Sequence, residues 1–356
     1  MRIRKELVEA LMIVGMTAVT SVGAQSLSDK TWGLQAQAGV DAPGAWNLMK
    51  SKGDCSKSGV IVAVIDTGID VDHPALKDVL WTNTKEANGK VGVDNDGDGY
   101  INDIHGWDFA RNSGKLVDKH GHGTHIAGII AASEKREGGL KGVCPGVRIM
   151  ALRYYDENAS GSDNLRNTIK AIEYAVAHGA NIINYSGGGA ERSNAEFQAL
   201  KMAEARGILV VAAAGNERSN VEELGKAYFP ASYELNNILA VTALDPSGNL
   251  LSSSNYGPHK VHVAAPGQSI LSSTPNGGYG YMSGTSQATA FVSGVAAMLL
   301  SENSSLTVRQ LKSFIEGSVM KSPKLLSKTI SGGRVNAEEA LVRMRSQSGR
   351  RAASSR

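Results

Sequence analysis

The stretch Val60-Ile61-Val62-Ala63-Val64-Ile65-Asp66-Thr67-Gly68 decides the expected fold. Its first six residues are continuously apolar and mostly β-branched. This pattern is typical of a strand that is buried on both faces, and such strands belong to parallel sheets. Because the carboxyl ends of parallel strands carry the site in open α/β sheets, Asp66 is a candidate functional residue. A turn-forming aspartate is the alternative.

Further along the chain, apolar runs alternate with helical patterns. The runs at 147–152, 182–185 and 208–213 predict strands, whereas residues 77–115 contain few apolar positions and predict a long loop. Apolar spacing and helix-end signals predict these helices: 41–50, 126–130, 162–178, 195–206, 288–300, 308–316 and 336–345. The alternation predicts an α/β fold, doubly wound, with a mostly parallel sheet and helices on both faces.

Composition is that of a soluble globular protein. The chain has 356 residues, of which 42% are apolar and 20% are charged. A net charge of +3 gives no reason to expect a nucleic-acid partner. One domain over 25–345 is expected, followed by a disordered basic tail over 346–356. Cys55 and Cys144 each precede a predicted strand, which is compatible with a disulfide or with two unpaired thiols.

The N-terminus has the order of a secretory signal peptide. Basic residues at positions 2, 4 and 5 precede an apolar run over 11–22, which ends in Val22-Gly23-Ala24. The run is too short for a membrane span, which needs about 20 residues. We therefore expect residues 1–24 to be a signal peptide and the protein to be secreted or otherwise extracytoplasmic. An ordinary N-terminal helix is the alternative.

Two glycine-rich segments lead into helices. Ser286 lies where a predicted helix begins, so its neighbouring backbone N–H groups suit an oxyanion, although a helix-capping serine is the alternative. His122, between Gly121 and Gly123, is placed as a general base. The nearby histidines at 120 and 125 raise the alternative of a zinc site, which is disfavoured because no cysteine or glutamate lies among them.

These residues supply complementary chemical roles. A serine hydroxyl is a weak nucleophile until a base takes its proton, and a carboxylate behind that base fixes its tautomer. Asp66, His122 and Ser286 provide these three groups. Asn216 follows a predicted strand, so its side-chain amide is a candidate oxyanion donor, with a turn asparagine as the alternative.

Four segments, at 64–70, 122–128, 212–216 and 284–288, resemble the signature motifs of the subtilisin-like serine proteases, the subtilases. Segments at 229–233, 254–258 and 263–267 resemble the family as well, and the resemblance covers roughly 32–345. It implies a serine endopeptidase that forms an acyl-enzyme on Ser286. It assigns Asp66, His122 and Ser286 to the triad, and Asn216 with the Ser286 N–H to the oxyanion hole.

The resemblance also implies how a peptide or protein substrate binds a monomeric enzyme. An extended peptide adds as a strand beside 185–189, with contacts to Ser186, Gly187, Gly188 and Gly215. The family usually has a larger apolar residue where Gly187 stands, so we expect a more flexible edge. Tyr228 corresponds to a position near the floor of the main specificity pocket, and its bulk is expected to narrow that pocket.

An acidic segment matches the opening of a calcium-binding loop of the EF-hand type. Its expected end carries His105 in place of the usual glutamate, so Asp103 is expected to close the site. A solvated acidic loop is the alternative, because like charges at this density repel one another. The predicted calcium ligands are Asp94, Asp96, Asp98, Tyr100 through its carbonyl, and Asp103.

Two rival functions use the same site. A non-catalytic peptide-binding module keeps the groove without turnover, and a transferase or macrocyclase passes the acyl group to an amine instead of water. The interval between Ala24 and Trp32 has no room for the long propeptide that secreted subtilases carry. Either the enzyme folds without one, or the sequence lacks part of the gene product.

Overall fold

The structure, a computed structural model, describes residues 27, 30–134 and 139–354, with side chains up to 347. The predicted signal peptide over 1–24 lies outside the described residues. The helices are α1 (Ala42–Leu48), α2 (Thr84–Ala87), α3 (His122–Ala131), α4 (Gly161–Ala177), α5 (Asn194–Ala205), α6 (Thr285–Glu302), α7 (Val308–Gly317) and α8 (Ala337–Ser354). None of them is long and apolar enough to cross a membrane.

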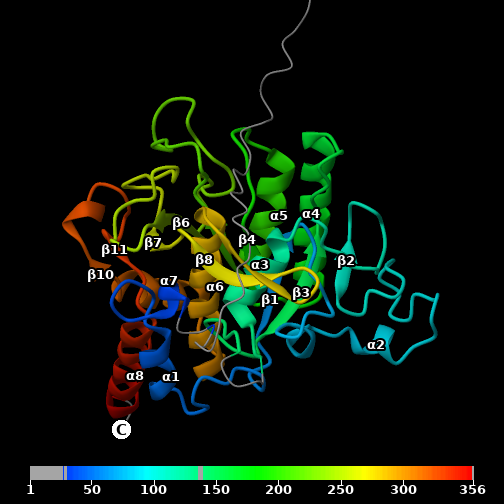
Figure 1. Cartoon of the computed structure of the whole chain (residues 1–356), viewed down its shortest axis with the longest axis horizontal. Coiled ribbons are helices and arrows are strands. Elements are labelled where there is room, and N and C mark those ends of the chain that lie inside the picture. The colour runs from blue at the N-terminus through cyan, green and yellow to red at the C-terminus, as the bar shows by residue number, and fades with distance from the viewer. Residues whose placement is uncertain (1–26, 28–29, 135–138, 355–356) are drawn as a thin grey trace, which may run out of the picture.

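A mostly parallel sheet forms the centre of the molecule (Figure 1), with the strand order β10-β11-β7-β6-β5-β4-β1-β3-β2. Only β10 pairs antiparallel within it. Its strands are β1 (Ile61–Asp66), β2 (Gly106–Asp108), β3 (Arg148–Arg153), β4 (Ile182–Tyr185), β5 (Leu209–Ala213), β6 (Ile238–Leu244), β7 (Val263–Pro266), β10 (Met320–Lys321) and β11 (Gly333–Arg334). A separate antiparallel hairpin joins β8 (Ile270–Thr274) to β9 (Gly278–Met282).

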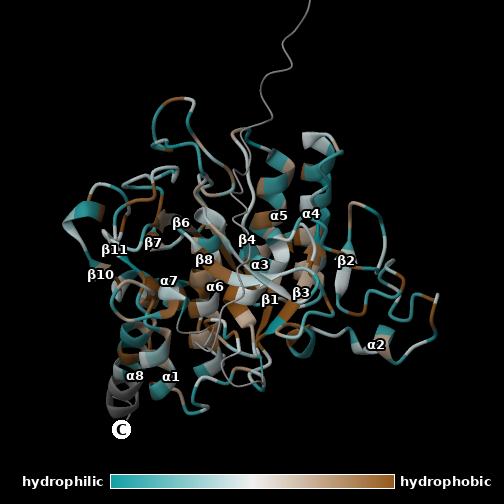
Figure 2. Cartoon of the chain, in the orientation of Figure 1, coloured by the Kyte–Doolittle hydropathy of each residue, from teal (hydrophilic) through white to brown (hydrophobic). Residues whose placement is uncertain are grey.

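Both faces of the sheet are covered, as the sequence predicts. Val62 and Val64 pack into one core with α3 and α6, whereas the alternating Ala63 and Ile65 pack into a second core with α4 and α5. Figure 2 shows the hydrophobic residues concentrated in the central strands and along α6. The α/β, doubly wound fold is therefore confirmed.

The order of the central strands places a site at the end of β1. After β1 the chain forms β2 and β3 on one side of β1, and then returns to β4 on the other. Such a reversal opens a crevice at the carboxyl ends of the strands, where ligands bind in open α/β folds. Asp66 is the last residue of β1 and so lies at this point.

The structure settles several expectations and corrects others. A disulfide joins Cys55 to Cys144, whose Cα atoms are 5.7 Å apart. The expected loop over 77–115 contains the short elements α2 and β2. The tail over 346–356, expected to be disordered, is helical as far as Ser354, because α8 continues through it. Arg345 ties this helix to the body of the protein through the Leu48 carbonyl and Glu302.

Candidate active site

Asp66 and His122 form a buried pair at the carboxyl edge of the sheet. The His122 ring donates from Nδ1 to Asp66 Oδ1 over 2.7 Å, and both side chains are about 95% buried. Burial by itself lowers the pKa of His122, but the charge and hydrogen bond of Asp66, with help from Asp118, raise that pKa above its usual 6.5. The contact orients the imidazole, so that its Nε2 is available to accept a proton.

Asp118 organises the turn that presents His122, and the sequence analysis did not identify it. Its carboxylate accepts hydrogen bonds from the Thr67 hydroxyl, from the backbone N–H groups of His120 and Gly121, and from both the N–H and the hydroxyl of Thr124. The side chain is 5% exposed. One buried carboxylate thus ties the end of β1 to the first turn of α3, which fixes His122 relative to Asp66.

Ser286 lies in the first turn of α6, where the N–H groups have no acceptor within the helix. Gly284 precedes this turn with a φ of +154°, which is a conformation that glycine tolerates and other residues avoid. The Ser286 hydroxyl donates to the Ser186 carbonyl over 3.0 Å, and the Ser186 hydroxyl donates to the Ser286 carbonyl over 3.3 Å. The two serines therefore hold the start of α6 against the end of β4.

The side chain of Asn216 points its oxygen at α6. Oδ1 accepts from the backbone N–H of Thr285 over 3.0 Å and from the Thr285 hydroxyl over 3.2 Å. With the oxygen held in this way, the Asn216 amide nitrogen remains as a donor beside Gly284, at the start of α6. The end of β5 and the start of α6 thus bring a side-chain donor and backbone N–H groups to one place.

The predicted residues therefore form two groups on one edge: Asp66 with His122, and Ser286 with Asn216. Helices α3 and α6 pack against each other, which brings the elements that carry the two groups together at this edge. In the described part of the chain, no hydrogen bond joins the Ser286 hydroxyl to His122. In ligand-free enzymes such bonds are often long or misaligned and form only with substrate, so this arrangement is compatible with a serine–histidine pair.

Neither of the other two histidines of the 120–125 segment belongs to a metal-binding group among the described residues. His125 is fully buried, and its Nε2 contacts the carbonyls of Ile270 and Gly280 at 2.9 and 3.2 Å. Burial and the neighbouring His122 lower the pKa of His125 to about 3, so this ring stays neutral and links α3 to the β8–β9 hairpin. His120 lies on the turn before α3 and contacts the Tyr155 ring edge-on.

Tyrosine side chains pack against glycines of the predicted substrate edge, and the flexibility of this edge stays a prediction. A β-carbon added at Gly187 would lie 2.2 Å from the Tyr154 hydroxyl, so Tyr154 already occupies that space. Added β-carbons at Gly188 and Gly215 would lie 2.5 and 2.9 Å from ring atoms of Tyr228. The Tyr228 ring thus packs between two glycine backbones, and burial raises the pKa of its hydroxyl.

The acidic segment forms a cluster that differs from the predicted ligand set. Glu86, Asp96 and Asp103 bring carboxylate oxygens within 4.8 Å of one another, and Asp96, Asp98 and His178 do the same with their ligand atoms. Asp94 belongs to neither group, because its oxygens accept from the N–H groups of residues 97–99. The sequence analysis missed Glu86 and His178, which come from α2 and from the end of α4.

Two of the three carboxylates in the first group are buried, and Asp96 is partly buried. Glu86 and Asp103 are 4% and 0% exposed. The Asn83 amide donates to both Asp96 and Asp103, and the Tyr174 hydroxyl donates to Asp103. Burial raises the pKa of Asp103, the Tyr174 and Asn83 hydrogen bonds oppose that rise, and the charge of Asp96 adds to it. Asp96 Oδ1 is shielded from solvent and has no hydrogen-bond partner.

A comparison with protein families identifies the chain. The model of the subtilase family matches residues 57–339. The chain belongs to the subtilase family. The subtilase motifs lie where the structure places the two groups at the edge of the sheet, so the family resemblance seen in the sequence is confirmed.

Several subtilases are similar to this chain. A thermophilic serine proteinase from Bacillus sp. (strain AK1) is 39% identical over 75% of the chain and 57% of the relative. Thermitase from Thermoactinomyces vulgaris is 35% identical over 85% of the chain and 93% of its own length. Subtilisin-like protease 1 from Plasmodium berghei (strain Anka) is 32% identical over 79% of the chain and 49% of that protein. The chain thus spans about half the length of two of these relatives.

A solved structure supports the same fold. The crystal structure of a cold adapted subtilisin-like serine proteinase superimposes with a TM-score of 0.64 at 28% identity. The match covers 86% of this subtilase and 96% of that chain. The mostly parallel sheet and its helical layers are therefore those of a subtilase.

Proposed function

We propose that this subtilase is a serine endopeptidase that hydrolyses peptide bonds through an acyl-enzyme on Ser286. The observation that carries the proposal is the buried contact of 2.7 Å between His122 and Asp66, on the same edge as Ser286. A base oriented in this way can take the serine proton, and the carboxylate stabilises the imidazolium that results.

The reaction follows from these positions. As the Ser286 oxygen attacks the peptide carbonyl, His122 Nε2 takes the hydroxyl proton, and negative charge develops on the carbonyl oxygen. The Asn216 amide and the Ser286 N–H are the donors for that charge. His122 then gives its proton to the leaving amine, and a water molecule hydrolyses the acyl-enzyme by the same route.

The substrate is a peptide or protein that lies along residues 186–188. Ser186 holds Ser286, and the bridge between Gly189 and Phe229, with hydrogen bonds of 2.9 and 2.8 Å, pins the segment in place. The Tyr228 ring between Gly188 and Gly215 fills space in the pocket for the side chain before the scissile bond. Small side chains at that position are therefore preferred over large aromatic ones.

Tyr228→Gly tests the pocket. We expect the ratio of kcat/KM for a phenylalanine peptide to that for an alanine peptide to rise by about 10–100-fold, since a side-chain-sized space opens. Tyr281→Gly, an exposed tyrosine on β9, is the matched control and should leave this ratio unchanged. A parent enzyme that already prefers large aromatic residues contradicts the assignment of Tyr228.

The acidic segment is proposed to hold a structural calcium ion. Carboxylate oxygens are the ligands that calcium prefers, and Glu86, Asp96 and Asp103 present them within 4.8 Å of one another. The unpartnered, buried Asp96 oxygen fits this assignment, because a buried acceptor without a partner destabilises the fold. A bound cation would offset the repulsion among these carboxylates.

The proposal includes a secreted or otherwise extracytoplasmic monomer, with 25–345 as the peptidase domain. The Cys55–Cys144 disulfide supports this location, because such bonds persist in oxidising compartments. Fractionation of cells that express the full chain, followed by gel filtration, tests both parts. An active protein confined to the cytosol contradicts the location, and elution as a dimer contradicts the monomer.

Labelling with a fluorophosphonate tests the catalytic proposal. We expect one phosphonyl adduct on Ser286, and products from a peptide library whose masses show the addition of water. Adduct formation should be lost in His122→Ala. A parent protein that binds peptides without labelling is a binding module, and product masses that show amine addition identify a transferase.

A further inference from the structure

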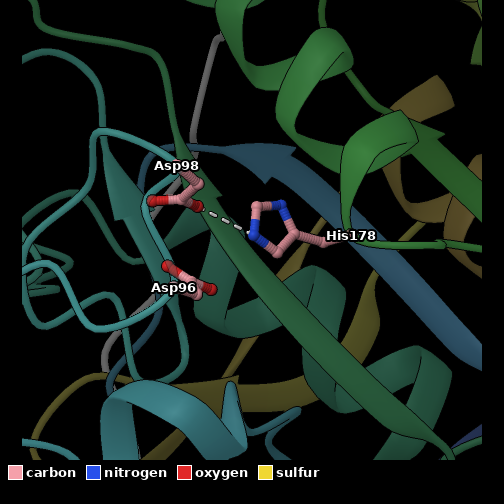
Figure 3. Close-up of side chains that lie close together, drawn as sticks. All are labelled: Asp96, Asp98 and His178. Atoms are coloured by element: carbon pink, nitrogen blue, oxygen red, sulfur yellow. Dashed lines mark ion pairs between the residues drawn. The ribbon is translucent and has the colours of Figure 1, made fainter.

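A second group of metal-binding atoms lies beside the acidic segment. Asp96 and Asp98, on the loop before β2, face His178 at the end of α4 (Figure 3). Their ligand atoms lie within 4.8 Å of one another. The three residues line a cavity of about 430 Å³ that opens to solvent beside Trp81 and Asn83. Unlike the Glu86, Asp96 and Asp103 group, this one includes a nitrogen ligand.

The imidazole of His178 is held in one orientation. Its Nδ1 lies 3.0 Å from the backbone carbonyl of Tyr174, which can only accept, so Nδ1 carries the hydrogen. The ring stacks on the Tyr174 ring at 3.9 Å and meets the Trp81 ring edge-on at 5.6 Å. Nε2 therefore faces Asp98. Metal-binding histidines typically donate their other N–H to a carbonyl or carboxylate in this way.

The carboxylates provide an open acceptor and the charge. Asp98 Oδ2 forms an ion pair with His178 Nε2 over 2.9 Å when the ring is protonated, and its Oδ1 accepts from the Tyr100 N–H. A bound cation would take the place of the proton between them. Asp96 uses Oδ2 to accept from the Asn83 amide, and its Oδ1 is buried without a partner. The two carboxylates supply negative charge for a divalent cation, with Asp96 shared between this group and the Glu86, Asp96 and Asp103 group.

We propose that Asp96, Asp98 and His178 form a binding site for a Zn²⁺ ion, adjacent to the all-oxygen calcium group, with which it shares Asp96. Imidazole nitrogen favours zinc over calcium, which takes oxygen ligands. Tetrahedral zinc with bonds of about 2.0–2.2 Å separates its ligand atoms by roughly 3.3 Å. Asp98 and His178 therefore need to move apart by about half an ångström. The fourth position faces the cavity, where water can bind.

Such an ion would link two segments that are distant in the sequence. The loop that carries Asp96 and Asp98 has little secondary structure, whereas His178 ends a helix of 17 residues that packs on the sheet. Zinc would anchor the loop to this helix. The predicted role is structural, because the site lies on a different part of the chain from the Ser286 crevice.

Zinc titration of metal-stripped protein tests the site, with Ser286→Ala as the background so that self-digestion does not interfere. Calcium is kept saturating, and binding is followed by calorimetry and by the visible absorption of Co²⁺ as a substitute ion. We expect one zinc ion per chain. His178→Gln should weaken zinc binding by at least about 10–100-fold while the calcium-induced rise in Tm is retained.

His105→Gln is the matched control. His105 lies in the same segment and contacts the Trp81 carbonyl at 2.8 Å, but it belongs to neither metal-binding group. The His105→Gln variant should bind zinc with the same affinity as the parent. Asp98→Asn is the second variant, used if His178→Gln fails to fold. Zinc affinity that is equal in the parent and in the folded ligand variant overturns the proposal, as does a parent that binds no zinc at millimolar concentration.

Discussion

The edge of the sheet that holds Asp66 and the acidic segment that holds Asp96 both bury carboxylates, but the carboxylate oxygens have different partners in the two regions. Asp66 and Asp118 are 4% and 5% exposed, and their oxygens accept from His122, from hydroxyls and from backbone N–H groups. In the acidic segment, Glu86 and Asp103 are equally buried, and the oxygens of the group converge on one another. The chain therefore completes the edge by itself, whereas the acidic segment brings three carboxylates together and leaves Asp96 Oδ1 without a partner, which is why we propose a cation there.

The largest expected effect is at the complete edge. Ser286→Ala should lower kcat by about 10⁶-fold, the loss known for the equivalent change in subtilisin, because the nucleophile is absent. The melting temperature should hardly change, since only one hydrogen bond to Ser186 is lost. Peptide hydrolysis measures kcat, and thermal unfolding measures the melting temperature. Ser283→Ala, three residues earlier, is the control, and retained turnover in Ser286→Ala would mean that this edge is not catalytic.

Asn216→Ala removes a donor without removing the nucleophile. We expect kcat to fall by about 10²–10³-fold with little change in KM, because the lost interaction forms only as charge develops on the carbonyl oxygen. Steady-state kinetics measure kcat and KM separately. Asn220→Ala, in the same loop, removes a contact to the Glu222 N–H and should leave kcat unchanged. A rise in KM alone for Asn216→Ala would place this residue in ground-state binding.

Removing calcium should affect the acidic segment and leave the edge intact. At a calcium concentration of 100 times Kd, chelation costs about 2.7 kcal/mol of the free energy of unfolding, and Tm should fall by several degrees. Asp96→Asn should make Tm independent of calcium. Asp245→Asn, which changes an exposed turn aspartate, should keep the full calcium response. A parent Tm that ignores calcium would show that this segment needs no cation.

The smallest expected effect is a shift in the pH profile. Catalysis needs neutral His122, so kcat/KM rises as pH increases through its pKa, which lies above 6.5. Asp118→Asn removes one of the charges that raise this pKa, so the rising limb should move to lower pH. The free energy of unfolding should fall by about 1–3 kcal/mol, because the new amide faces N–H donors. If the rising limb of the kcat/KM profile moves to higher pH in Asp118→Asn, this account is contradicted.

The sequence predicted the edge better than the acidic segment. Asp66 ends an apolar run and His122 begins a helical one, so local pattern alone places each at an end of an element. Asp118 was missed because its role depends on Thr67 and Thr124 meeting it in space. Nothing in the residues around Asp118 signals that convergence.

The sequence predicted an acidic metal-binding segment, but it did not predict which residues form the metal-binding groups. Its spacing suggested that consecutive aspartates would surround one ion, whereas in the structure Asp94 holds the backbone of the turn. Glu86 enters from α2, just before the segment, and His178 enters from the distant end of α4. Strands β2, β6, β7, β8, β9, β10 and β11 were also not anticipated. The β8–β9 hairpin is mostly Ser, Thr, Gly and Tyr, so it lacks the apolar run that marks β1.

The Cys55–Cys144 disulfide spans 89 positions and closes a covalent ring that contains Asp66, the acidic segment and His122. A single cut within that ring, for example near Val91, which is 86% exposed, leaves both pieces attached to each other. Nicked and intact molecules then migrate together in electrophoresis without reductant. A preparation damaged by its own activity would look whole until it was reduced, so purity has to be judged on reduced samples.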